Sequence, residues 1–324
     1  MKLKGFLSIA IVIVMVLALA GCGGNSSAAD YPKQTIKVYV PYAPGGGSDT
    51  LARAMIQAID IPVDMVAVNM EGANGLVGTM EAFNANADGY SILVQSAQDL
   101  MGFSMSGATD ISLYEEMETI CYLVGDFNFV VTNKESGWKT IEDMVEYAKA
   151  HPGDVKWSCS GGQGIDFAET NLVLEGLGIK DVVTVVPYDS GSSGNVALLG
   201  NHVQMSTNTT TEIAGSIEAG DVIPLLAIAK ERLEWAPDVP TTLEKGVDYS
   251  SYSPRGFYAP PGTPAEIVKY LQDAMEKVLA NDEFVERMTS FGLITNFVPG
   301  EQAFKDMKAQ ESFLKPFFEN MEDE

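Results

Sequence analysis

Residues 36–49 of the chain read IKVYVPYAPGGGSD. The first five of them alternate between apolar and polar side chains and predict a strand that stops at a proline. The helix that follows, predicted over residues 48–59, places Leu51, Met55 and Ile59 on one face. A strand, a glycine-rich turn and a helix in this order predict α/β layers with parallel sheet.

The same alternation of strands and helical stretches continues along the chain. Thr140 is predicted to cap a helix that ends by residue 150. Asp166 with Glu169, and Thr263 with Glu266, have the spacing of a capping box and predict two further helix starts. Short apolar runs predict further strands at residues 66–68, 90–94, 129–131, 182–186 and 222–228.

The turn at residues 41–49 is predicted to seat an anion. Its three glycines let the backbone approach a guest, the helix dipole favours negative charge there, and Ser48 adds a hydroxyl donor. Residues 157–166 and 187–194 form two more donor-rich loops, each between a strand and a helix. Together they suggest a carboxylate or phosphate clasped between two lobes. An empty tight turn is the alternative interpretation of residues 41–49 taken alone, because they lack a nucleotide-binding motif.

The N-terminus has the features of an export signal. Lys2 and Lys4 precede an apolar run over residues 6–20, and Leu19-Ala20-Gly21-Cys22 resembles a lipobox. We therefore expect residues 1–21 to be removed and Cys22 to carry lipid, because the apolar run is shorter than the roughly 20 residues of a membrane span. Residues 22–30 would be a flexible tether with a reach of roughly 15 Å. This places the body outside the cytoplasm, in the periplasm or on the outer face of the cell membrane.

Composition excludes several classes of protein. The net charge is −24, and loss of Lys2 and Lys4 with the signal changes it to −26. Such a surface repels nucleic acid and anionic lipid, so neither is an expected partner. A hydrophobic content of 46% excludes a disordered chain, and the residues after the signal suffice for two lobes.

The residues suited to catalysis or metal binding form no recognisable constellation. His151 and His202 are the only histidines, and neither belongs to a nucleophile–base arrangement. Asp49 and Asp189 could form an acid/base pair in an exported hydrolase, which stays open as an alternative. No cysteine–histidine cluster or calcium loop occurs, so neither a metal nor a cofactor is expected. Two free thiols are favoured over a bond between the remaining cysteines, Cys121 and Cys159.

Several motifs carry a family resemblance. They are the stretch from Val40 to Asp49, then Gly72-Ala73-Asn74-Gly75, residues 87–93, residues 148–153 and the run from Gly256 to Pro264. In these motifs and their order, the chain resembles the extracytoplasmic solute receptors of tripartite tricarboxylate transporters, often called Bug receptors. The matches span almost the whole chain after the tether.

The resemblance implies a two-lobed periplasmic-binding-protein fold of the twice-crossing kind (type II), with a ligand cleft between the lobes. The first lobe would comprise residues 31–130 and 256–324, and the second residues 131–255. It also implies a monomer without catalytic activity, which closes over a small organic acid and presents it to membrane permease subunits. A receptor that feeds a membrane sensor is a further alternative.

Carried over to this sequence, the resemblance places the ligand carboxylate between backbone groups of the first glycine loop and of the second-lobe loop. The residues expected to bind are Tyr42, Ala43, Gly46, Gly47, Ser48, Asp49 and Ser96 from the first lobe, and Ser160, Gly162, Gln163, Gly164, Tyr188, Asp189 and Asn208 from the second.

This chain departs from the family pattern in ways that concern the ligand. Met70-Glu71 stand where the family usually has Arg-Pro, Ile165 replaces a common serine, and Asp189-Ser190 replace Lys-Gly. A possible cation is lost and an acid is gained, which disfavours a simple dicarboxylate. We therefore predict a monocarboxylate, or a ligand with an amine that pairs with Asp189.

Overall fold

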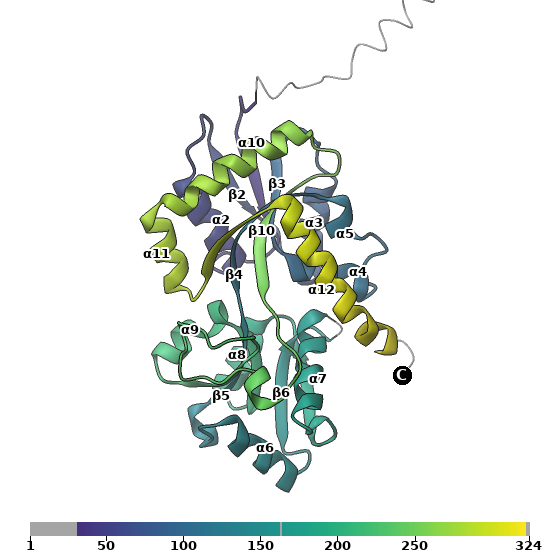
Figure 1. Ribbon diagram of the computed structural model, residues 1–324, viewed down its shortest axis with the longest axis vertical. Coiled ribbons are helices and arrows are strands. Elements are labelled where there is room, and N and C mark those ends of the chain that lie inside the picture. The colour runs from purple at the N-terminus through teal and green to yellow at the C-terminus, as the bar shows by residue number, and fades with distance from the viewer. Residues whose placement is uncertain (1–30, 163, 322–324) are drawn as a thin grey trace, which may run out of the picture.

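The computed structural model describes residues 31–162 and 164–321. The described chain forms two lobes arranged along the long axis of the molecule, each a sheet with helices on both faces (Figure 1). The expected signal, tether and lipid site at Cys22, together with Gln163, lie outside the described residues. Within those residues, no helix has both the length and the apolar composition needed to cross a bilayer.

The first lobe is built on a mixed sheet in the order β11-β4-β10-β3-β1-β2. β1 pairs in parallel with β2 and β3, whereas β10 runs antiparallel to β3 and β4, and β11 antiparallel to β4. The strands are β1 (Ile36–Val40), β2 (Met65–Asn69), β3 (Ser91–Ser96), β4 (Glu118–Asp126), β10 (Ser253–Ala259) and β11 (Ile294–Pro299).

The second lobe is built on a sheet in the order β7-β6-β8-β5-β9. β6 pairs in parallel with β7 and β8, and β5 runs antiparallel to β8 and β9. The strands are β5 (Asn128–Asn133), β6 (Val155–Ser160), β7 (Val183–Tyr188), β8 (Met205–Thr209) and β9 (Val222–Ala227).

The chain passes between the lobes twice, at Phe127 between β4 and β5 and again just before β10 (Figure 1). The predicted domain boundaries, after residues 130 and 255, fall inside β5 and β10, a few residues past these passages. β5 and β10 each enter the interior of a sheet from the other lobe, and each is antiparallel to both of its neighbouring strands. The sheets are therefore mixed, and the expectation of parallel sheet holds only for part of each.

Helices cover both faces of each sheet. In the first lobe, α2, α10 and α11 share one apolar core with the sheet, and α3, α4 and α12 pack on its other face. The first-lobe helices are α2 (Gly47–Ala58), α3 (Leu76–Phe83), α4 (Ala97–Met105), α5 (Leu113–Glu116), α10 (Ala265–Glu276), α11 (Asp282–Ser290) and α12 (Gly300–Met321). Those of the second lobe are α6 (Ile141–Ala150), α7 (Ile165–Gly176), α8 (Gly191–Leu199) and α9 (Thr210–Glu218). Short 3-10 turns are η2 (Ala73–Gly75), η3 (Lys134–Ser136), η4 (Lys180–Val182), η5 (Leu243–Lys245) and η6 (Lys277–Ala280).

Local sequence signals account for the elements that position the first glycine turn. β1 has the predicted limits, and α2 begins at Gly47 and buries Leu51 and Met55 completely. Each side chain of that size contributes about 1.5–3 kcal/mol when buried. Thr140 caps α6 as predicted, by accepting a hydrogen bond from the amide of Asp143.

The other two predicted capping boxes are wrong. Glu169 is fully buried, and its carboxylate accepts hydrogen bonds from the Asn128 side chain at 2.5 Å and the Tyr249 hydroxyl at 2.7 Å. α7 instead begins at Ile165, after Gly164. The Thr263 hydroxyl donates to the carbonyl of Pro260 at 2.8 Å, so α10 starts without a side-chain cap.

The two cysteines of the described chain are free and buried, as favoured from sequence. Burial raises the pKa of the Cys159 thiol to about 12 and the pKa of the Cys121 thiol further, so neither forms a reactive thiolate at neutral pH. We expect neither thiol to react with a soluble alkylating reagent at pH 8 until the protein is unfolded. Peptide mass spectrometry after labelling checks this, and modification of either cysteine in the folded protein would contradict it.

Candidate functional site

A cavity of about 740 Å³ lies between the two lobes. The first glycine turn and Arg255 line it from the first lobe, and the loops that precede α7 and α8 line it from the second. Five carboxylic acids and one arginine are among its described lining side chains: Glu71, Asp99, Asp166, Asp189, Glu212 and Arg255. A larger cavity of about 1000 Å³ lies against α12 and residues 248–252, but none of the glycine loops lines it.

Helices α2 and α7 both begin at the cavity without a side-chain cap. α2 follows Gly46 and α7 follows Gly164, and neither residue has a side chain that could accept from the first amides. In contrast, α8 is capped by Ser190, which accepts from the amide of Ser193 at 3.2 Å. The first amides of a helix have no partner within the helix. The start of α2 therefore presents donors and a positive dipole end to the cavity, as the sequence predicts.

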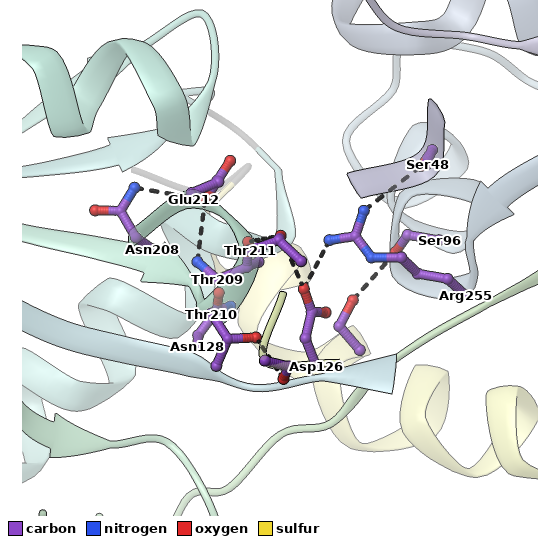
Figure 2. A network of polar contacts seen from close by, with 12 residues as sticks. Ser48, Ser96, Asp126, Asn128, Asn208, Thr209, Thr210, Thr211, Glu212 and Arg255 are labelled. Carbon is purple, nitrogen blue, oxygen red and sulfur yellow. Dashed lines mark hydrogen bonds and ion pairs between the residues drawn. The ribbon is translucent and has the colours of Figure 1, made fainter. Parts of the chain in front are cut away.

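Arg255 places a guanidinium beside the start of α2. Figure 2 shows this side chain reaching from β10 between Ser48 and Asp126. Its Nη2 forms an ion pair with Asp126 Oδ2 at 2.9 Å, and its Nη1 lies 3.5 Å from the Ser48 hydroxyl. The Arg255 side chain is 12% exposed and Asp126 is fully buried. Burial favours the neutral form of Arg255, but the charge of Asp126 overcomes this and holds the pKa of Arg255 above its usual value.

A glycine is needed where α2 meets this guanidinium. A Cβ atom at Gly47 would stand 2.8 Å from Arg255 Nη1 and 3.3 Å from the Thr211 hydroxyl. Thr211 lies in α9 of the second lobe, and its hydroxyl donates to Asp126 Oδ2 at 3.4 Å (Figure 2). The two lobes therefore meet closely at this point.

Three acidic side chains face the cavity from different helices. They are Asp99 of α4, Asp166 of α7 and Glu212 of α9, all half-buried. Burial raises the pKa of each carboxyl above its usual value. The negative charges of Glu169, Asp99 and Glu212 raise the pKa of Asp166 further. The cavity is thus strongly acidic outside the corner that Arg255 and the start of α2 occupy.

Asp49 holds the glycine turn instead of lining the cavity. Its carboxylate accepts from the Gly45 amide at 2.9 Å, from Arg53 Nε at 2.9 Å and from the Asn69 side chain at 2.9 Å. Burial opposes its ionisation, but the hydrogen bond from Arg53 and the other donors hold the pKa of Asp49 below its usual value. Tyr42 does line the cavity, and its hydroxyl donates to Asp99 at 2.7 Å.

The structure brings together about half of the residues expected to bind. Gly162 and Tyr188 lie at an adjoining pocket with Asp189, and Gly162 and Gly164 lie at a smaller pocket beside Asp166. The Asn208 side chain donates to the Gly191 carbonyl at 2.8 Å and does not line the main cavity. Those that line the main cavity are Tyr42, Ala43, Gly46, Gly47, Ser48, Ser96, Ser160 and Asp189.

Sequence reasoning missed Arg255, Asp99, Asp166 and Glu212 as cavity residues. Arg255 directly precedes the Gly256-Phe257 motif, and Asp166 closes the second loop, where it was interpreted as a helix cap. Only for these two residues would a position at the edge of a glycine-rich motif have been an available signal. Asp99 and Glu212 sit in the first turns of α4 and α9, where an acid is ordinary.

The residues of the hydrolase alternative do not form an acid/base arrangement. Asp49 is held by Arg53 and Asn69, and Asp189 is exposed at the rim of the cavity. His151 ends α6 and stacks on Tyr147. No group of three or more potential metal ligands occurs in the part of the chain that the structure describes.

Comparison with known proteins agrees with this architecture. Residues 50–315 match the sequence model of the tripartite tricarboxylate transporter family receptor. The chain is 28% identical to protein BugT of Bordetella pertussis over 289 residues, which cover 87% of each protein.

Solved structures show the same fold. The periplasmic binding protein BugD is 26% identical with a TM-score of 0.77, over 90% of this chain and 98% of BugD. MatC from Rhodopseudomonas palustris, solved with bound malate, is 22% identical with a TM-score of 0.76, over 90% of this chain and 99% of MatC. These likenesses confirm the predicted two-lobed periplasmic-binding-protein fold.

Proposed function

Because the chain belongs to the tripartite tricarboxylate transporter receptor family, we propose that it captures a small organic carboxylate between its lobes and delivers it to membrane permease subunits. The receptor acts outside the cytoplasm, held to a membrane by lipid on Cys22, and performs no catalytic step. Closure of the two lobes over the ligand provides the shape that the permease recognises.

One observation carries the carboxylate assignment. The start of α2 and the guanidinium of Arg255 lie side by side at the interlobe cavity, with Ser48 between them. Backbone amides at a helix start and a guanidinium are both donors that suit a carboxylate. The malate in the structure of MatC supports a small organic acid as the ligand of this fold.

Calorimetric titration tests the proposal directly. Purified receptor is titrated with a panel of small carboxylates, some with and some without an amino group, and with neutral amides of the same size. We expect at least one carboxylate to bind and its amide to bind far more weakly. Binding of the amides as tightly as the acids would contradict the proposal.

The Gly47→Ala substitution is expected to weaken carboxylate affinity about tenfold. The new Cβ would displace the Arg255 guanidinium from its place beside the helix start, since only 2.8 Å separates the two positions. Titration with the best carboxylate of the panel measures the change. Gly215→Ala in α9 is the control, because a Cβ there meets no atom within 4 Å. Equal affinities of both variants and the unmodified protein would contradict this prediction.

A further inference from the structure

We infer that the ligand carries an ammonium group beside its carboxylate, and that Asp99 and Asp166 bind this ammonium opposite the Arg255 corner of the cavity. This inference rests on the proposed function and names the chemical class of the ligand. It differs from the amine partner predicted from sequence, Asp189, which is exposed at the rim.

The first support is the charge of the cavity wall. Arg255 is the only cation among the described lining residues, and Asp126 already pairs with it. A second carboxylate on the ligand would therefore face Asp99, Asp166 and Glu212 without a compensating cation. An ammonium group in the same place would meet opposite charges, which in a partly buried site attract more strongly than in water.

The second support is a set of acceptors that no protein donor occupies. Asp99 uses Oδ2 to accept from Tyr42, and Asp166 uses Oδ1 to accept from Asn128. The other oxygen of each carboxylate receives no hydrogen bond from the described residues. These free oxygens can accept from an ammonium group, which has three donors and no acceptor.

The side chain of Gln98 provides a third hydrogen-bond acceptor. The residue is 4% exposed and lines the cavity. Its side-chain nitrogen donates to Glu169 Oε1 at 3.5 Å, and its side-chain oxygen accepts from no described residue. This oxygen can accept a hydrogen bond from an ammonium group in the cavity.

The carboxyl groups of Asp99 and Asp166 lie where the main cavity adjoins a smaller pocket. Asp99 and Asp166 line both the main cavity and a side pocket of about 180 Å³, which Gly102, Phe103 and Ala108 also line. They come from opposite lobes, α4 and α7. An ammonium group bound between them would therefore also draw the lobes together, because it removes the repulsion that opposes their approach.

Matched ligand pairs test the inference. Receptor at pH 7 is titrated calorimetrically with L-aspartate against succinate, L-glutamate against glutarate, L-alanine against propionate and 4-aminobutyrate against butyrate. We expect the amine-bearing member of the best pair to bind at least tenfold more tightly. Because an ammonium favours the ionised carboxyls, binding is also expected to release protons, seen as a dependence of the measured heat on the ionisation enthalpy of the buffer.

Two variants test whether Asp166 is responsible for the preference for amine-bearing ligands. Asp166→Asn is expected to remove most of the preference for the amine, whereas Asp181→Asn, an equal change of charge at an exposed position of the second lobe, is expected to leave it intact. Loss of the preference in Asp189→Asn but not in Asp166→Asn would overturn the assignment.

The outcomes separate this inference from the proposed function. Equal or tighter binding of the acids without an amine overturns the ammonium site and leaves the carboxylate receptor standing. Equal binding of 1,4-diaminobutane and 4-aminobutyrate would overturn the carboxylate assignment instead. Failure of every pair and of the diamine to bind would overturn both.

Discussion

Replacing Arg255 with methionine is expected to lower the free energy of unfolding by about 3–5 kcal/mol, because it leaves the Asp126 carboxylate buried without its partner. Asp126 is fully buried, and among the described side chains it would keep only the long hydrogen bond from Thr211. Its second oxygen already has no partner among the described residues. Urea unfolding followed by circular dichroism at pH 7 measures the change.

The loss of stability is expected to depend on which residue of the Arg255–Asp126 ion pair is replaced. Asp126→Asn is the milder change, because Asp99 and Glu212 still provide negative charge near Arg255. The double variant Arg255→Met with Asp126→Asn should recover much of the lost stability, since the buried carboxylate at position 126 is no longer left without its partner. Arg232→Met is the control, as its ion pair with Glu244 is about half exposed on both sides and contributes less than about 1 kcal/mol. A double variant no more stable than Arg255→Met would contradict this account.

The parts of the fold that were predictable from sequence depend on local patterns. The alternation in β1, the glycine run before α2 and the Thr140 cap each involve residues a few positions apart. The wrong capping box at Glu169 shows the limit of such patterns. Its carboxylate is bound by Asn128 and Tyr249, which are 41 and 80 positions away and meet it only in the folded chain.

In the candidate site, too, the features set by local sequence were predictable and those set by distant residues were not. The backbone donors at the start of α2 were predicted, because a glycine run before a helix has the same geometry wherever it occurs. Arg255 was missed because its partners, Asp126 and Ser48, are 129 and 207 positions away. Asp49 was predicted to bind ligand, but its carboxylate holds Gly45 of the glycine turn and Arg53 of α2. Spacing alone does not distinguish an acid that faces a cavity from one that holds a loop.

The Asp166→Asn substitution is expected to raise the free energy of unfolding of the ligand-free protein at pH 7 by about 1–2 kcal/mol. Burial and the charges of Glu169 on α7, Asp99 on α4 and Glu212 on α9 raise the pKa of Asp166 well above 3.8. Asparagine keeps the shape of the protonated side chain and removes this repulsion. The lost attraction of a carboxylate to the start of α7, less than about 1 kcal/mol, offsets part of the gain.

The same substitution should change how stability depends on pH. Between the ordinary pKa of 3.8 and the raised pKa, the folded protein holds more protons at Asp166 than the unfolded chain does. Stability therefore falls as the pH rises through this window, and Asp166→Asn should flatten that slope. Thermal unfolding from about pH 4.5 to about pH 8 checks the expectation, with the exposed Asp181→Asn variant as control. A steeper slope or lower stability in Asp166→Asn would mean that Asp166 stabilises the ligand-free lobes. A gain in stability together with a loss of amine preference would instead show that the cavity keeps an unfavourable charge because the ligand requires it.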